Sequence, residues 1–172
     1  MAAARHFVET MRAFFQWAID SDIVKTDPTR DVKTPKKSAG GFPVWTQEEA
    51  DAYRARWPIG TRERLAFELF DGTGLRISDV AVFGRQHVKE HVDPTSGERF
   101  RVGSIVTIKT NERVWFRMGA MLESAIAASP AAGLTFMETS RGTPFRKESL
   151  GNWMRPAIRA AGVKKSDRKS VV

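Results

Sequence analysis

Arg76 and Lys109 are the residues whose types and positions best suit chemistry on a phosphate group. Arg76 follows a glycine-rich turn, Gly72 to Gly74, and would open a helix, where unpaired backbone N–H groups and the helix dipole favour an anion. Lys109 would lie at the tip of a β-hairpin, from which a long cationic side chain can reach a phosphate oxygen. Taken singly, Arg76 could instead pair with Asp79 or Glu68, and Lys109 could be a solvated turn residue. Their combination predicts a surface that contacts phosphate.

The charge of the chain also indicates a polyanionic partner. Its 172 residues include 28 lysines and arginines against 20 acidic residues, a formal net charge of +8. Such an excess is typical of nucleic-acid binding, although it can serve solubility alone. With no cysteine, the chain has neither a thiol nucleophile nor a cysteine-based zinc site. It also lacks an N-terminal signal segment and any run of the roughly 18 apolar residues that span a bilayer. We therefore expect a cytoplasmic protein with no membrane partner.

The elements that would position these residues fall into two parts joined by a linker. Phe7, Met11, Phe14 and Ala18 share one stripe of a helix over residues 2–19. A single helix cannot bury its own apolar stripe, so residues 1–32 are interpreted as the C-terminal remnant of a helical domain. Residues 33–44 combine proline, paired lysines and paired glycines, as a linker does. Residues 45–172 then form a second, partial domain.

The sequence pattern of the second part predicts a mainly α fold with a small antiparallel β-sheet, which is an α+β class. Its first helix has a capping-box start, in which Thr46 and Glu49 cap each other's backbone and Trp45 staples onto Ala50. Residues 87–92, 104–108 and 113–116 are rich in β-branched and aromatic residues, which predicts three strands. The remaining predicted helices cover residues 61–70, 76–83, 121–126 and 146–161, and Pro156 should kink or restart the last of them.

The order of these motifs resembles the tyrosine recombinase (phage integrase) family. The segment from Thr73 to Val80 resembles the family's first arginine box, and Ile108-Lys109-Thr110 is similar to its hairpin lysine segment. Residues 134–145 and the helix through residues 153–163 are similar to the approach to its next catalytic box. Residues 7–37 resemble the end of its core-binding domain and the following linker. The resemblance implies the family's catalytic-domain fold over roughly residues 42–163.

The resemblance also implies a chemistry and partners. In this family a tyrosine attacks the scissile phosphate without metal or nucleotide cofactor, which gives a 3′-phosphotyrosyl link and a 5′-hydroxyl. Two arginines stabilise charge on the phosphoryl oxygens, a lysine protonates the leaving oxygen and a histidine assists proton transfer. Arg76 and Lys109 match two of these roles, and Lys36 and Lys37 would add contacts to the DNA backbone. Double-stranded DNA is the expected partner, together with a second copy or a full-length recombinase bound to it.

The chain departs from the family pattern after Gly162-Val163, where a His-x-x-Arg box and later a tyrosine are expected. Lys165 to Arg168 has that spacing with lysine in the place of histidine, so Arg168 is a candidate for a vestige of the second arginine. The sole tyrosine, Tyr53, lies far upstream and is interpreted as a helix surface or core residue. The histidines are also upstream: His6, His87 and His91. We expect a DNA-binding fragment, truncated at both ends, that does not cleave DNA alone.

Two other hypotheses remain open. The nucleophile could come from a full-length partner or from Tyr53, which would make the chain an enzyme. Alternatively, the chain is a non-enzymatic helical DNA-binding or regulatory protein. In each case, loss of the family's last helices would leave apolar surface uncovered, from which we expect marginal stability and self-association.

Overall fold

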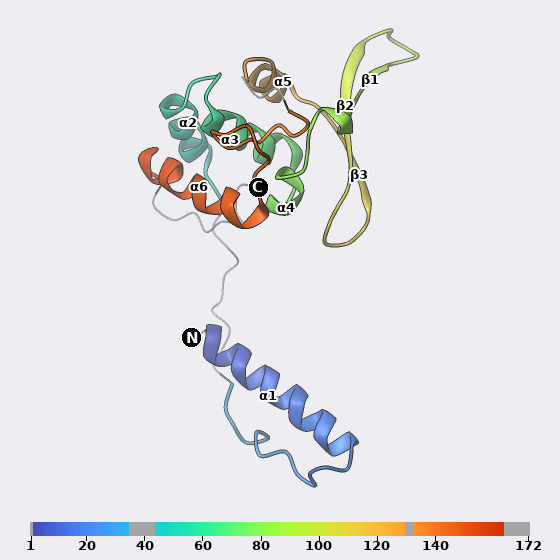
Figure 1. The fold of residues 1–172 in the computed structure, drawn as a ribbon, viewed down its shortest axis with the longest axis vertical. Coiled ribbons are helices and arrows are strands. Elements are labelled where there is room, and N and C mark those ends of the chain that lie inside the picture. Colours follow the sequence, from blue (N-terminus) through green and yellow to red (C-terminus); the bar gives the residue numbers. More distant parts are fainter. Residues whose placement is uncertain (1, 35–43, 130–132, 164–172) are drawn as a thin grey trace. The chain divides into compact units, whose positions relative to one another are not determined.

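The computed structural model describes residues 2–34, 44–129 and 133–163, and the chain divides into two compact units, residues 1–41 and 42–172 (Figure 1). Over the described residues it contains six α-helices, a short 3-10 helix and one three-stranded antiparallel sheet. The predicted fold class, mainly α with a small antiparallel sheet, is therefore confirmed. Lys36, Lys37 and Arg168 lie outside the described residues. Within the described segments, no helix is both long and apolar enough to span a membrane.

The first unit is built on α1 (Ala2–Asp20), close to the predicted helix. After it the chain turns back, and the backbone N–H groups of Ile23 and Val24 donate to the carbonyl of Ala18, at 2.9 and 3.4 Å. Ala18 is buried by this turn, but Phe7 and Phe14 on the same stripe remain 65% and 50% exposed. Within the described residues of this unit, 2–34, most of the apolar face of α1 is thus uncovered.

The second unit is organised around α3 (Arg62–Thr73), whose residues from Arg64 to Phe70 are all buried. A helix with no solvent-facing side in its middle must be surrounded by other elements. Its packing partners are α4 (Ile77–Val80), α5 (Ala120–Ala127) and α6 (Lys147–Ala160), and α2 (Gln47–Arg56) is tied to it by ion pairs. Figure 1 shows these helices gathered around α3 in one body. The α3 helix therefore holds the other helices in place.

The start of α2 confirms the predicted capping box. The hydroxyl of Thr46 accepts from the N–H of Glu49 at 3.3 Å, and the Glu49 carboxylate accepts from the N–H of Thr46 at 3.1 Å. Trp45 packs its ring against Tyr53 and Phe67, with centroid distances of 5.6 and 5.5 Å. The cap and the aromatic contacts together fix where the second unit begins.

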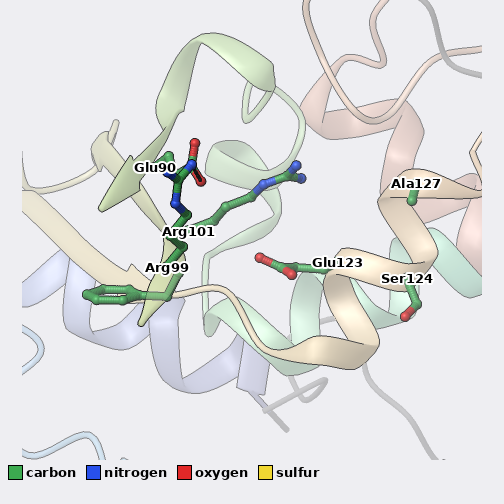
Figure 2. A pocket seen from close by; sticks show the side chains of 7 residues that line it. Glu90, Arg99, Arg101, Glu123, Ser124 and Ala127 are labelled. Atoms are coloured by element: carbon green, nitrogen blue, oxygen red, sulfur yellow. Dashed lines mark ion pairs between the residues drawn. The ribbon is translucent and has the colours of Figure 1, made fainter. Parts of the chain in front are cut away.

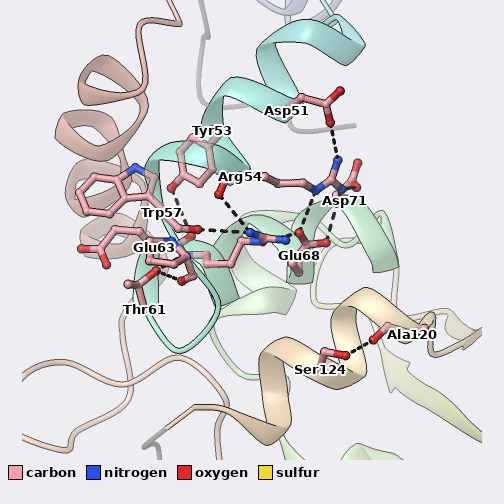
Figure 3. Close-up of polar contacts among 12 residues, drawn as sticks. Asp51, Tyr53, Arg54, Trp57, Thr61, Glu63, Glu68, Asp71, Ala120 and Ser124 are labelled. Carbon is pink, nitrogen blue, oxygen red and sulfur yellow. Dashed lines mark hydrogen bonds and ion pairs between the residues drawn. The ribbon is translucent and has the colours of Figure 1, made fainter.

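An ion network centred on the buried Glu68 joins α2 to α3 (Figure 3). The carboxylate of Glu68, 2% exposed, accepts from Nε of Arg64 at 2.7 Å and from Nε of Arg54 at 3.0 Å. Arg54 also donates to Asp71 at 2.6 Å. A buried carboxylate requires such partners, because an unpaired charge in the interior is strongly destabilising. The carboxylate of Glu68 is therefore paired with Arg64 and Arg54.

Three helix boundaries differ from the sequence prediction. The α3 helix continues through Gly72 and ends at Gly74, whose φ of 64° is left-handed, so the predicted break at Gly72 was wrong. The α4 helix has only four residues and does not reach Phe83. The α6 helix runs through Pro156 and is not restarted by it. Burial of Leu150 and Ile158 on either side of the proline stabilises α6 as one element.

The sheet consists of β1 (Val88–Val92), β2 (Arg99–Val106) and β3 (Arg113–Arg117), in that spatial order, after the 3-10 helix η1 (Arg85–His87). Strand β1 pairs with residues 99–103 of β2, and β3 pairs with residues 102–106. Strand β2 is therefore paired with both of its neighbours only at Val102 and Gly103. Figure 1 shows the consequence, two hairpins that point in opposite directions from a shared middle strand.

Gly103 allows the two hairpins to meet. A Cβ atom at this position would lie 2.3 Å from a ring carbon of Phe116, its partner on β3. Phe116 in turn packs its ring against Phe83 of the helical core, at a centroid distance of 5.4 Å. The absence of a side chain at residue 103 thus lets Phe116 lie across β2 and attach the sheet to the core.

Candidate phosphate-contacting site

Arg76 directly precedes α4 and is exposed. Its backbone carbonyl accepts from the N–H groups of Asp79 and Val80, at 2.8 and 2.9 Å, and so begins the helix. Within the described segments its side chain makes no hydrogen bond or ion pair. The alternative in which Arg76 pairs with Asp79 or Glu68 is therefore wrong. Among the described residues, no acidic side chain therefore occupies its guanidinium.

Asp79 connects α4 to the hairpin that carries Lys109. Its side chain is fully buried, and Oδ1 accepts from the backbone N–H of Ile108 at 2.9 Å. The hydroxyl of Ser78 lies 3.5 Å from the same oxygen, while Oδ2 is buried without a hydrogen-bond partner among the described residues. The segment from Arg76 to Asp79 is thereby attached to the residue next to Lys109. From its place in the sequence, Asp79 was predicted only as a possible partner for Arg76, and its bond to Ile108 was not predicted.

The hairpin turn itself is held by the side chain of Thr107. Its hydroxyl shares a hydrogen bond with the hydroxyl of Thr110 at 2.7 Å, and its N–H donates to the carbonyl of Glu112 at 2.9 Å. Asn111 closes the turn with a left-handed φ of 55°, a conformation that asparagine tolerates better than most residues. Lys109 is exposed in this turn, as predicted. The turn therefore presents a lysine on a backbone fixed from both sides.

Tyr53 lies in the core of the second unit, which decides between the two expected positions, helix surface and core. Its ring is 0% exposed and stacks on Phe67 at 4.9 Å, and its hydroxyl donates to the backbone carbonyl of Glu63 at 3.2 Å. Burial, and to a lesser extent the negative charge of Glu63, raises the pKa of Tyr53 above its usual range. The hydroxyl is therefore neutral and inaccessible to a DNA backbone.

The three histidines lie away from Arg76 and Lys109 in the sequence, and two of them make contacts of their own. Nδ1 of His87 accepts from the N–H of Gly84 at 3.1 Å, and burial lowers the pKa of His87. The ring of His91 lies 6.0 Å from that of Phe100 on the sheet, and His6 is on α1. None of these described histidines hydrogen-bonds to the Arg76 segment or to the Lys109 turn. Among the described residues there is also no cluster of three or more metal-ligating side chains.

An open pocket of about 360 Å³ lies between the sheet and α5 (Figure 2). Arg99 and Glu90 form an ion pair at its rim, at 3.6 Å, and the side chains of Arg101 and Glu123 face the opening. Neither Arg76 nor Lys109 lines it. The pocket is therefore separate from the segments that the Asp79 hydrogen bond joins.

Comparison with curated sequences finds partial relatives, whereas no family model matches the chain. The chain is 32% identical over 83 residues to tyrosine recombinase XerD of Lacticaseibacillus casei, a match that covers 46% of this chain and 28% of the relative. It is 33% identical over 73 residues to tyrosine recombinase XerD of Ralstonia nicotianae, which covers 40% of this chain and 24% of the relative. The matches thus span under a third of each relative's length.

Comparison with solved structures shows the fold. Lambda integrase residues 75–356 bound to DNA align over 99% of this chain and 62% of that one, with a TM-score of 0.75 and 18% identity. The lambda integrase catalytic core aligns over 73% of both chains, with a TM-score of 0.52 and 18% identity. The XerA recombinase aligns over 92% of this chain and 55% of its own, with a TM-score of 0.57. The helices around α3 and the three-stranded sheet are therefore arranged as in these proteins.

Proposed function

We propose that this chain, which belongs to the tyrosine recombinase (phage integrase) family, binds duplex DNA for site-specific recombination and contacts a backbone phosphate with Arg76 and Lys109. The observation that carries the proposal is the exposed guanidinium of Arg76, which has no partner among the described residues. The hydrogen bond from Ile108 to Asp79 supports it, because this bond attaches the Arg76 segment to the Lys109 turn.

The two cations would have different roles at the phosphate. Arg76 can donate two parallel hydrogen bonds to non-bridging oxygens, which suits the charge that builds there during attack at phosphorus. Lys109 can transfer a proton to the 5′-oxygen as its bond to phosphorus breaks. We further propose that Lys36 and Lys37 contact the DNA backbone, and that Arg168 stands in the place of the second arginine.

By itself the 172-residue chain would bind DNA without cutting it. The burial of Tyr53, the one tyrosine of the 172 residues, and its raised pKa support this proposal, because they keep its hydroxyl protonated and away from a phosphate. This observation disfavours the alternative in which Tyr53 is the nucleophile. Solved relatives are described as a lambda integrase dimer bound to a core site and a tetramer bound to a Holliday junction. We propose that this chain likewise acts in assemblies on DNA, with copies of itself or with a complete recombinase.

A salt titration of DNA affinity tests the proposed phosphate contact. Fluorescence anisotropy with a labelled duplex would give the dissociation constant of the unchanged protein and of Arg76→Ala at several salt concentrations. Loss of one phosphate contact should weaken binding at low salt and reduce the slope of log affinity against log salt by about one unit. An unchanged slope and affinity would refute the role of Arg76.

Arg99→Ala is the matched control for this titration. It removes the same charge from an exposed arginine that is already paired with Glu90. Both variants should unfold at similar urea concentrations, because neither side chain is buried. A change in the salt slope in Arg76→Ala alone would separate a specific contact from the effect of net charge.

A further inference from the structure

One face of the sheet is exposed and carries two aromatic rings among cations. Neighbouring side chains of a strand point to opposite faces, and residues paired across strands share a face. Trp115 pairs with Ser104 and Arg117 with Val102, so Arg113, Trp115 and Arg117 lie on the same side. We call this side the outer face; its residues are Lys89, His91, Phe100, Val102, Ser104, Val106, Arg113, Trp115 and Arg117.

The opposite face of β2 and β3 already has a structural role. Phe116 packs on Phe83, and Ile105 is 3% exposed in the hydrophobic core. Trp115, by contrast, is 62% exposed, although it is the largest apolar side chain on its strand. An exposed tryptophan is not required to close the core, and it leaves the face of an indole ring open for a ligand.

The cations of the outer face are arranged around its rings. The guanidinium of Arg113 lies 6.0 Å from the centre of the Trp115 ring and donates to the hydroxyl of Ser104 at 3.4 Å. The guanidinium of Arg117 lies 4.6 Å from the centre of the Phe100 ring and pairs with Glu98. Arg113 has no acidic partner among the described residues. At its Trp115 end, the outer face therefore has an aromatic ring beside an arginine, Arg113, that forms no ion pair with a described acidic residue.

We infer that the outer face binds single-stranded DNA, with an unpaired base stacked on Trp115 and the adjoining phosphates contacted by Arg113 and Lys109. Every base offers a flat π-face, and an aromatic ring beside cations is the usual platform for bases that have left a duplex. A duplex hides those faces, so it would contact this surface through phosphates only. The inference rests on the proposed function in one respect, that the chain acts on DNA.

A protein that exchanges DNA strands would benefit from a surface that binds unpaired bases. A strand must leave one duplex before it joins another, and its bases are unpaired in between. Trp115 and Lys109 belong to the same hairpin, on β3 and in the turn before it. A base held by Trp115 would therefore lie within one hairpin's length of the phosphate-contacting turn.

Fluorescence anisotropy with two labelled probes tests the inference: a 12-nucleotide single strand and the blunt duplex of the same sequence. Trp115→Ala should weaken binding of the single strand about 5- to 150-fold, the range for loss of one stacked base. Binding of the duplex should change by less than about twofold, because phosphate contacts remain. Trp115→Phe keeps a stacking ring and should recover most of the single-strand affinity.

Trp17→Ala is the matched control, because Trp17 is similarly exposed, at 56%, but lies on α1. It should leave single-strand affinity unchanged, and urea unfolding should show that all three variants are folded. The inference is overturned if Trp115→Ala binds the single strand normally, if it weakens both probes equally, or if Trp115→Phe fails to recover binding. If the unchanged protein does not bind the duplex, the proposed function fails instead, and the single-strand comparison still decides the inference.

Discussion

A single buried carboxylate, that of Asp79, sets the geometry of the candidate site at the scale of residues. Its Oδ1 accepts from the N–H of Ile108 at 2.9 Å, and because the Asp79 side chain is fully buried, loss of this bond would leave a buried acceptor without its partner. Arg76 lies three residues before Asp79, and Lys109 immediately follows Ile108. The position of Lys109 relative to Arg76 therefore depends on a residue that need not contact DNA at all.

A double-mutant cycle measures this dependence. Lys109→Ala should weaken duplex binding in the unchanged protein, but it should have a smaller effect in Asp79→Ala, where the turn is no longer attached to α4. We expect a coupling energy of about 0.5–3 kcal/mol, the range for residues that act through a shared contact. The readout is the dissociation constant of the four proteins on one labelled duplex.

Asp79→Asn provides the control for that cycle, because its amide oxygen can still accept from Ile108. Its affinity should stay closer to that of the unchanged protein than the affinity of Asp79→Ala. Strict additivity of Asp79→Ala and Lys109→Ala, with both proteins folded in urea titrations, would contradict a positioning role for Asp79.

At the scale of elements, the sequence predicted the helices well because their signals are local. The Thr46 cap and the apolar spacing that predicted α1, α5 and α6 depend only on neighbouring residues. The start of β2 was placed five residues too late, at Ser104 instead of Arg99, because charged residues interrupt its apolar pattern. Its pairing with β1 is a tertiary contact that the pattern does not contain.

The candidate site was predictable only in part, for a related reason. Arg76 and Lys109 were identified by residue type and by the motifs that resemble a known family. Asp79 was not, because its partner is a backbone N–H group 29 residues away, and a carboxylate beside an arginine in sequence suggests an ion pair first. Trp115 was expected only as part of a strand, since exposure cannot be read from a run of β-branched and aromatic residues.

Gly103→Ala tests how the two hairpins are joined. The added methyl group would meet the Phe116 ring at 2.3 Å, so either the ring or the strand must move. Overpacking of this kind should lower the free energy of unfolding by about 1–3 kcal/mol, measured in urea. Gly119→Ala, where a new Cβ meets nothing within 4 Å, should lower it by clearly less. Equal effects of the two substitutions would show that the close approach of Phe116 is unimportant.

At the scale of the whole molecule, the chain combines two exposed cations, Arg76 and Lys109, with a deeply buried tyrosine. Tyr53 is held by stacking on Phe67 and by its hydrogen bond to Glu63, and both contacts belong to the core that keeps α2 on α3. Bringing its hydroxyl to a phosphate would require that core to open. The packing that stabilises the fold is therefore also what would keep Tyr53 from acting as a nucleophile.

A covalent-adduct assay checks the link. The 172-residue protein, incubated with a nicked duplex and separated on a denaturing gel, should give no band of protein attached to DNA, at any pH at which it stays folded. Tyr53→Phe should behave identically in this assay. An adduct that forms with the unchanged protein and disappears in Tyr53→Phe would refute both the proposal and the assignment of Tyr53 to the core.

The staggered sheet bears on how such a protein can change over evolutionary time. Because β1 pairs only with residues 99–103 and β3 with residues 102–106, the turn at residues 93–97 lies at the far end of the sheet from Lys109. Exposed turns of this kind accept inserted residues readily. The first hairpin could therefore be lengthened, shortened or decorated without shifting the register of the second, so that new surface could be acquired while the lysine stays in place.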